Sequence, residues 1–329
     1  MNGELMTKQK EKTMLEVAHH RHVLGEFIGN KPGPLFICMA GMHGNETAGV
    51  DAVKTVFQLL QLEPHVNPTF NYNGTFLGIL GNAEAYHQQK RFIAKDLNRI
   101  WTPENVRRVK ETPYEKLQAE DKELRELVEL IEAKIRQHQP TRVVMLDLHT
   151  TSAHGGIFAI ASDHPESIRI AVELHAPVIT GMLEGINGTT LHYFVKENFG
   201  LPTIGVAFEA GQHNDHLSVN RCIAAIINCM RSIKAVRAED VENRHDALLI
   251  EYSKDLPKVA RLVSVHHIKP DDHFRMKPGF RNFQRIHKGQ LLATDIRGPI
   301  YAPEGGRILM PLYQNQGSDG FFIVQEESH

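Results

Sequence analysis

The chain has 329 residues, of which 41% are hydrophobic and 23% are charged, and this composition excludes a wholly disordered or fibrous protein. Its 37 basic and 39 acidic side chains leave a formal net charge of −2, which indicates neither a nucleic-acid partner nor an anionic membrane surface. Three widely spaced cysteines, polar first residues without a signal-peptide core, and no apolar run near the roughly 18 residues of a spanning helix predict a cytoplasmic protein.

Strand-like and helix-like patterns alternate along the first two thirds of the chain. Leu35 to Ala40 is a short continuous apolar run bounded by prolines and Gly41, which predicts a strand buried on both faces. Further strands are expected at residues 75–80, 143–146, 157–161 and 203–208, and helices at 46–61, 113–140, 165–175 and 218–233. This alternation predicts an α/β domain with helices packed on a central sheet.

The composition changes near residues 237–246, a charged stretch that is typical of a linker. Beyond it, short strand-like pieces are interrupted by proline and glycine, which favours a small β-rich unit. We therefore expect two domains, residues 1–238 and residues 239–329, with the second capping a cleft in the first.

The first strand leads through Gly41-Met-His-Gly-Asn-Glu46 directly into a helix. His43 and Glu46 stand three residues apart across this turn, so one imidazole and one carboxylate can converge on one metal ion. Taken alone, such a pair more often belongs to a polar surface turn.

Two later strands also end in chemically active side chains. Asp147 and His149 follow four apolar residues and share one face of their strand, at the sheet edge where α/β proteins bind ligands. His149 could be a third metal ligand oriented by Asp147, or a strand-end histidine bonded to its neighbours. Glu209 closes the strand at 203–208, where a buried carboxylate needs a partner and a salt bridge would also explain it.

Arginine and asparagine side chains gather in the loop at residues 90–99. Arg91, Asn98 and Arg99 are donors suited to a carboxylate or an oxyanion, although a basic loop is usually only solvated. In combination the weak signals support one another. Two histidines and a glutamate leave a coordination position open for water, as hydrolytic zinc sites do.

Four motifs in this order resemble one known family: Gly41-x-His-Gly-Asn-Glu46, Asp96-Leu-Asn-Arg99, Asp147-Leu-His149-Thr-Thr and Phe208-Glu-Ala-Gly211. They are similar to the succinylglutamate desuccinylase/aspartoacylase family, a branch of the zinc carboxypeptidase-like fold. The resemblance covers roughly residues 35–235 and extends loosely into the C-terminal part. It implies a mixed central sheet flanked by helices, with one zinc ion per chain.

The resemblance also implies roles for individual residues. His43, Glu46 and His149 match the family's zinc ligands, and Glu209 matches its general acid/base. Arg91 matches the arginine that polarises the scissile carbonyl.

On the substrate side, Asn98 and Arg99 match the pair that holds the substrate α-carboxylate. Aspartate-specific members carry a further arginine before the glutamate strand, but residues 191–199 contain only Lys196 as a cation. Lys196 is our candidate for that role, and Tyr313 is a candidate for a late substrate-contacting tyrosine.

The sequence thus predicts zinc-dependent hydrolysis of the amide bond of a small N-acyl amino acid. A carboxypeptidase-type metallopeptidase and a non-catalytic small-molecule-binding relative are the alternatives, and a homo-oligomer is compatible with either. A separate tract, His19-His20-x-His22, looks metal-binding but fits a solvated strand better.

Overall fold

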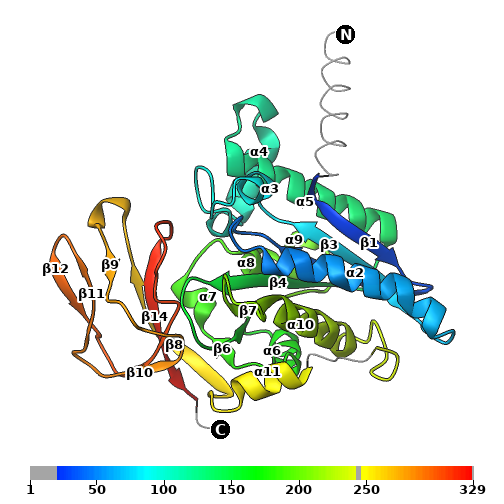
Figure 1. Cartoon of the computed structure of the whole chain (residues 1–329). Helices are drawn as coiled ribbons and strands as arrows, with labels where there is room; N and C mark the ends of the chain where they lie inside the picture. Colours follow the sequence, from blue (N-terminus) through cyan, green and yellow to red (C-terminus); the bar gives the residue numbers. More distant parts are fainter. Residues whose placement is uncertain (1–20, 242–245, 328–329) are drawn as a thin grey trace.

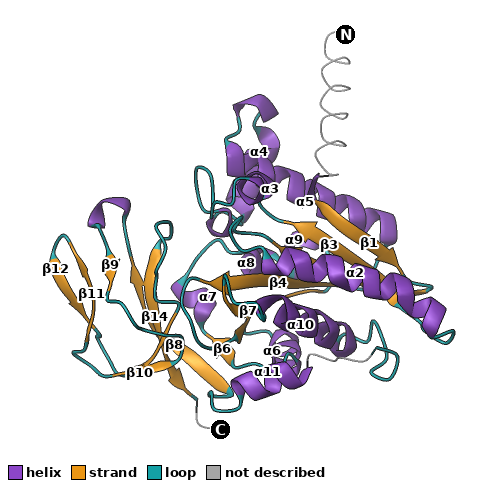
Figure 2. Cartoon of the chain, viewed as in Figure 1, coloured by secondary structure: helices purple, strands orange, loops and turns teal. Residues whose placement is uncertain are grey.

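The computed structural model describes residues 21–241 and 246–327, and two sheets make up its β-structure. A large mixed sheet of 11 strands carries helices on both faces, and a sheet of three antiparallel strands lies at the C-terminal end (Figure 1, Figure 2). This arrangement confirms the predicted fold class of a mixed central sheet flanked by helices with a smaller β-rich part.

Four neighbouring parallel strands of the large sheet come from the first two thirds of the chain. β2, β3, β4 and β7 run parallel to one another, so their carboxyl ends meet at one edge. In spatial order the sheet contains β1 (Val23–Ile28), β3 (Asn73–Leu80), β2 (Lys31–Ala40), β4 (Val143–Thr151), β7 (Thr203–Gln212), β5 (Phe158–Ala161), β6 (Val178–Thr180), β8 (Val259–His267), β14 (Asp319–Glu326), β13 (Gly306–Leu309) and β10 (Gln284–Ile286).

Helices cover both faces of this sheet, as the continuous apolar strands require. The helices that pack with one face are α2 (Ala48–Val66), α6 (Pro165–Glu173), α10 (Ser218–Ser232) and α11 (Asp246–Ser253). The helices that pack with the other face are α4 (Pro103–Glu111) and α5 (Ala119–His138). Short helices occupy the connections: α3 (Ala83–His87), α7 (Met182–Gly185), α8 (Thr190–Tyr193) and α9 (Lys196–Phe199).

The long helix expected between Pro113 and Pro140 begins later than its sequence pattern suggests. Residues 114–116 form a single 3₁₀ turn, Leu117 and Gln118 are extended, and α5 starts at Ala119. Leu117 is buried in the same core as the helix, so its apolar character reflects packing rather than helical periodicity.

The C-terminal strands do not form an isolated unit. β8 pairs in parallel with β6, so the large sheet continues across residue 238 and through β14, β13 and β10. The separate three-stranded sheet contains β12 (Gly298–Tyr301), β11 (Leu291–Asp295) and β9 (Arg275–Met276). The division at residues 238 and 239 stays a prediction, and part of the expected linker, residues 242–245, lies outside the described residues.

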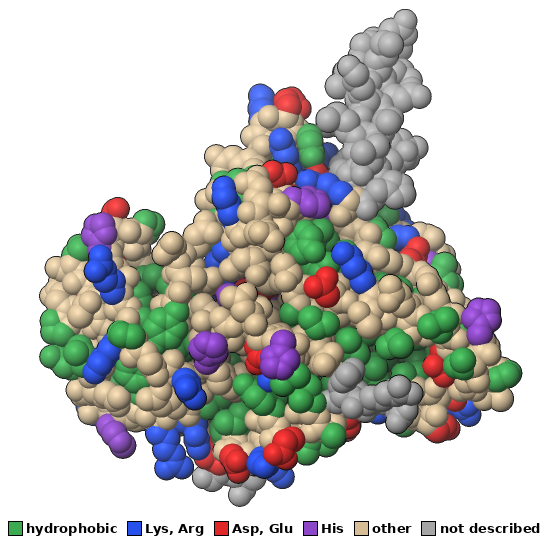
Figure 3. Space-filling model, viewed as in Figure 1, with side chains coloured by type: hydrophobic (Ala, Val, Ile, Leu, Met, Phe, Trp, Pro, Cys, Tyr) green, Lys and Arg blue, Asp and Glu red, His purple; other side chains and the backbone are tan. Residues whose placement is uncertain are grey.

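Charged side chains of both signs are interspersed over the face drawn in Figure 3, in keeping with the small net charge. Among the described residues, no helix combines the length and apolar character needed to cross a membrane.

Candidate metal centre

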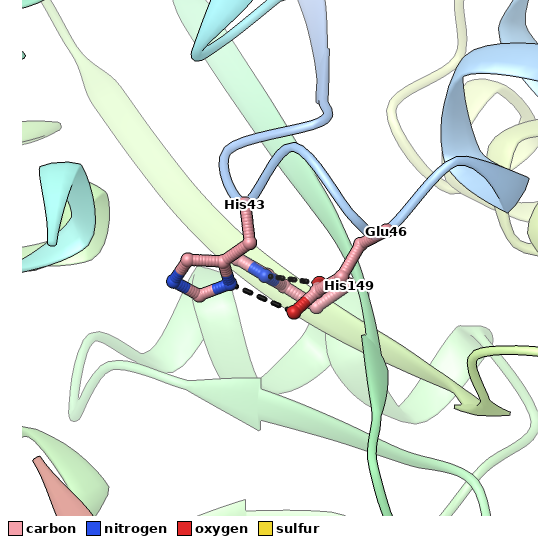
Figure 4. A group of neighbouring side chains, drawn as sticks. All are labelled: His43, Glu46 and His149. Atoms are coloured by element: carbon pink, nitrogen blue, oxygen red, sulfur yellow. Dashed lines mark hydrogen bonds and ion pairs between the residues drawn. The ribbon is translucent and has the colours of Figure 1, made fainter. Parts of the chain in front are cut away.

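The predicted metal ligands meet at the carboxyl edge of the parallel strands. His43 and Glu46 lie in the turn between β2 and α2, and His149 lies near the end of β4 (Figure 4). The turn approaches another loop so closely that a Cβ on Gly44 would stand 2.1 Å from the backbone carbon of Ala85. Only glycine fits there, which explains its place between the two ligands.

Glu46 stands between the two imidazoles. Its Oε1 lies 2.8 Å from His43 Nδ1, and its Oε2 lies 3.1 Å from His149 Nδ1. One ligand atom from each of the three residues lies within 4.8 Å of the others, and all three side chains are buried. The three predicted ligands are therefore brought together closely enough to share one ion.

A second carboxylate contacts the other nitrogen of each imidazole. His43 Nε2 lies 3.1 Å from Asp96 Oδ1, and His149 Nε2 lies 3.2 Å from Asp147 Oδ2. Thr190 Oγ1 in turn donates to Asp147 Oδ2 over 2.6 Å. Such contacts fix the orientation of an imidazole so that its other nitrogen, Nδ1 in both histidines, can face a metal.

The electrostatics of the cluster favour an ionised Glu46. Burial would raise the pKa of Glu46, but His43 and then His149 outweigh it and hold that pKa well below its usual range. Burial likewise opposes charge on His149, yet Asp147 and Glu46 hold the imidazole's pKa well above its ordinary value. A metal ion at this position would take the place of that proton.

Glu209 lies on β7 directly beside His149 in the strand register. The side chain is 6% exposed, and its Oε2 has no hydrogen-bond partner among residues 21–241 and 246–327. Burial raises the pKa of this carboxyl to about 7. A carboxyl with this pKa can exchange a proton near neutral pH, which a general acid/base requires. No salt bridge of Glu209 occurs in the described residues, so the alternative explanation for its position has no support there.

Arg91 is held against the same cluster. Its Nη1 lies 3.4 Å from Glu46 Oε1 and its Nη2 lies 3.1 Å from Asp96 Oδ2, while the buried Nε has no partner within the described residues. Glu120 on α5 anchors the following loop, because its carboxylate accepts hydrogen bonds from three successive backbone N–H groups, those of residues 93–95.

Asn98 and Arg99 line the same cleft as the metal ligands and Glu209. Asn98 Oδ1 accepts a hydrogen bond from the Thr190 backbone over 3.0 Å. Arg99 Nη2 donates to Asp319 Oδ2 over 2.6 Å, and Asp319 lies at the start of β14 in the C-terminal part of the chain. Residues between 310 and 319 thus supply part of the cleft lining.

Two predicted substrate residues lie away from the cleft. Lys196 is exposed at the start of α9 and does not line it. The Tyr313 hydroxyl accepts from the Phe280 backbone and donates to the Lys277 carbonyl, so it is engaged in the C-terminal part of the chain. The structure brings neither residue to the site.

The structure also assigns contacts that sequence reasoning missed. Asp96 belongs to the motif Asp96-Leu-Asn-Arg99, but the sequence does not indicate its contact with His43. Thr190 has no local signal for its contact with Asp147. Asp319 lies in the C-terminal stretch to which the family resemblance loosely extends, but its pairing with the distant Arg99 cannot be inferred from that stretch.

A second group of one histidine and two glutamates also lies within 4.8 Å: His22, Glu123 and Glu126. His22 is fully buried, so the expectation of a solvated strand is wrong for this residue, and His19 and His20 lie outside the described residues. Arg21 and Tyr114 also donate to this group.

The sequence profile of the succinylglutamate desuccinylase/aspartoacylase catalytic domain matches residues 32–233. A probable aspartoacylase from a Nostoc species is 23% identical over 301 residues, which cover 85% of this chain and 90% of that protein. A succinylglutamate desuccinylase from Pseudomonas paraeruginosa is 26% identical over 297 residues, covering 83% and 78%. The crystal structure of a Vibrio parahaemolyticus succinylglutamate desuccinylase has the same fold, with a TM-score of 0.60, 18% identity, and coverage of 92% and 85%.

Proposed function

Because the chain belongs to the succinylglutamate desuccinylase/aspartoacylase family, we propose that it is a zinc-dependent hydrolase of the amide bond of a small N-acyl amino acid. One observation carries the proposal. His43, Glu46 and His149 converge beside Glu209, whose carboxylate has an oxygen without a partner in the described residues. Hydrolytic zinc sites combine three protein ligands of this kind with an open position.

The donor set fits zinc. Two imidazole nitrogens and one carboxylate oxygen form a ligand set that Zn²⁺ binds in catalytic sites, and both imidazoles are oriented by carboxylates. Bound zinc would supply Lewis-acid activation of water and of the scissile carbonyl. We propose one ion per chain.

Glu209 is the proposed general acid/base. The carboxylate accepts a proton from the attacking water and later donates it to the leaving amine, and a pKa of about 7 suits both directions of transfer. Arg91 is the proposed donor to the negative charge that develops on the carbonyl oxygen, because its guanidinium is fixed by Glu46 and Asp96 beside the ligands.

Asn98 and Arg99 are the proposed contacts of the substrate α-carboxylate. Arg99 is held in place by Asp319, and only part of its fork of N–H groups is used by that contact. The segment at residues 310–319 closes the cleft beside this pair, which supports a cap that admits a single amino acid derivative. A cytoplasmic location is part of the proposal, since small acylated amino acids are soluble metabolites.

A panel of N-acetyl, N-succinyl and N-formyl amino acids tests this function by the release of free amine, with and without a chelator. We expect hydrolysis of at least one member, loss of activity with chelator, and recovery with added zinc. Release of amino acids from peptides but from no member of the panel would instead favour the metallopeptidase. No hydrolysis of either class by zinc-loaded protein would contradict catalysis altogether.

A further inference from the structure

Apolar side chains that have no part in the proposed chemistry line part of the cleft. We give the name apolar wall to six of them: Ile160 on β5, Met182 on α7, Ile186 just after α7, Leu191 on α8, Ala207 on β7 and Phe322 on β14. All six belong to one buried core cluster.

The strand register places this wall next to the proposed general acid/base. Ala207 precedes Glu209 by two residues on β7, so both side chains lie on the same face, about 7 Å apart along the strand. Ile160 on β5 is the direct partner of Ala207. A substrate group adjacent to the amide would therefore contact the small side chain of Ala207 and the apolar side chain of Ile160 beside it.

Within the described residues, Arg91 and Arg99 are the lysine or arginine side chains that line the cleft. Arg91 is assigned to the carbonyl oxygen and Arg99 to the α-carboxylate, and each also pairs with acidic side chains, Arg91 with Glu46 and Asp96 and Arg99 with Asp319. Neither arginine is therefore left over for a second substrate carboxylate. A charged side chain entering here would lose its hydration without gaining a dedicated partner, whereas an apolar side chain would gain from burial.

Part of the apolar wall lies beside the proposed α-carboxylate site. The segment that supplies Ile186 and Leu191 also contacts the proposed α-carboxylate site, because Thr190 N donates to Asn98 Oδ1 over 3.0 Å. In the same segment, Gly188 O accepts from Trp101 N over 2.9 Å. A substrate carboxylate at Asn98 and Arg99 would bring the side chain on the same carbon near this segment.

We propose that the amino acid released by this enzyme carries an apolar side chain, held by the apolar wall. This inference rests on the proposed function and narrows its substrate class. It excludes aspartate and glutamate derivatives as preferred substrates, although both occur in the names of the relatives.

Substrate preference is the first test. We expect kcat/KM for N-acetyl-L-leucine to exceed that for N-acetyl-L-aspartate by at least about 100-fold, because the aspartate carboxylate has no partner. Equal or faster hydrolysis of the aspartate derivative would overturn the inference while leaving the proposed function intact. Failure to hydrolyse any N-acyl amino acid would instead overturn the proposed function.

A charge placed in the wall is the second test. Leu191→Arg should lower the leucine-to-aspartate ratio of kcat/KM at least about tenfold, because it supplies the missing cation. The matched control is Leu62→Arg on α2, where Leu62 is 59% exposed, and it should leave the ratio unchanged. An unchanged ratio in folded Leu191→Arg protein would contradict the assignment.

Two further measurements distinguish the proposal from misfolding of the variant and from a substrate bound with its acyl group, instead of its amino acid, at the apolar wall. Ile186→Ala should lower kcat/KM for N-acetyl-L-leucine at least about tenfold and leave N-acetylglycine within about threefold. In Leu191→Arg, the preference among formyl, acetyl and succinyl groups on leucine should stay the same. A change in acyl preference instead of amino-acid preference would overturn the orientation, as would equal binding of the leucine and aspartate derivatives to Glu209→Gln in calorimetry.

Discussion

Two buried groups in this protein contain nearly the same metal-binding side chains, yet their surroundings differ. The cleft group is His43, Glu46 and His149, and the buried group is His22, Glu123 and Glu126. In the buried group every carboxylate oxygen already has a donor, from Arg21, His22, Tyr114 or the backbone of residues 83 and 84. The buried group therefore acts as a link between the N-terminal strand and α5.

The cleft group differs in what stands around it. It lines a cleft, and the neighbouring Glu209 and Arg91 each keep a buried polar atom without a partner in the described part of the chain. Because buried polar groups are normally paired, these atoms support the proposed binding of a metal ion and substrate at this group. The two groups are therefore distinguished by their position in or away from the cleft and by unpaired polar atoms nearby, more than by the types of side chain that they contain.

The largest effect is expected for Glu209→Gln. Removal of the general acid/base should lower kcat by about 10²- to 10⁴-fold and leave the zinc content unchanged, because Glu209 is not among the ligands. Steady-state kinetics and metal analysis on the same preparation check this. A variant that retains more than a tenth of the wild-type kcat would contradict the role of Glu209.

A comparable loss, in stability rather than activity, is expected for Glu126→Gln. The substitution removes the carboxylate that accepts from Arg21 Nε and His22 Nε2 and leaves Glu123 as their remaining acidic partner, so the free energy of unfolding should fall by about 1–3 kcal/mol at pH 7. Urea unfolding measures this loss. Lys254→Gln is the control on an exposed pair and should change stability by less than about 1 kcal/mol.

The same carboxylate predicts a pH dependence. Burial opposes its ionisation, but bonds from His22 and Tyr114 lower the pKa of Glu126 from 4.5 to about 2. Its stabilising contribution is present above about pH 4.5 and is lost as pH falls towards 2. The stability difference between wild type and Glu126→Gln should therefore shrink on acidification, and a constant difference would be evidence against this cause.

A smaller effect is expected for Asp147→Asn in the cleft group. The carboxylate that orients His149 is lost, so zinc affinity should fall about 10- to 100-fold. Competition with a chromogenic chelator measures the affinity. Asp240→Asn, which weakens the pair of another buried carboxylate with Arg237 outside the cleft, should leave zinc affinity unchanged.

The smallest effect is expected for Asp319→Asn. Loss of the charged contact should leave Arg99 less well positioned and raise KM about tenfold, with kcat nearly unchanged. Asp295→Asn, which removes a partner of Arg297 on a hairpin remote from the cleft, is the matched control. A fall in kcat with constant KM would assign Asp319 to the chemical step instead.

Much of this fold can be predicted from local sequence patterns. The strands at 35–40, 143–146 and 203–208 are continuous apolar runs, and the side chains that follow them meet because parallel strands end at one edge. The metal ligands and the position of Glu209 beside His149 follow from that rule, and the family resemblance is confirmed by the match over residues 32–233.

Other features depend on contacts between distant segments and have no local signal. Asp319 pairs with Arg99 across 220 positions, and the parallel pairing of β6 with β8 joins the C-terminal strands to the main sheet. The burial of His22 depends on two glutamates about 100 residues away. Lys196 is the only cation in residues 191–199, where aspartate-specific members of the family carry an arginine, but its exposed position on α9 depends on tertiary packing that this local pattern does not contain.

Zinc content after exhaustive dialysis tests the distinction between the two groups most directly. The isosteric variants Glu46→Gln and Glu123→Gln each change one glutamate, in the cleft group and the buried group respectively. We expect about one zinc per chain in wild type and in folded Glu123→Gln, and far less than one in Glu46→Gln. Full zinc occupancy in Glu46→Gln together with loss of zinc in Glu123→Gln would contradict the assignment of the metal centre.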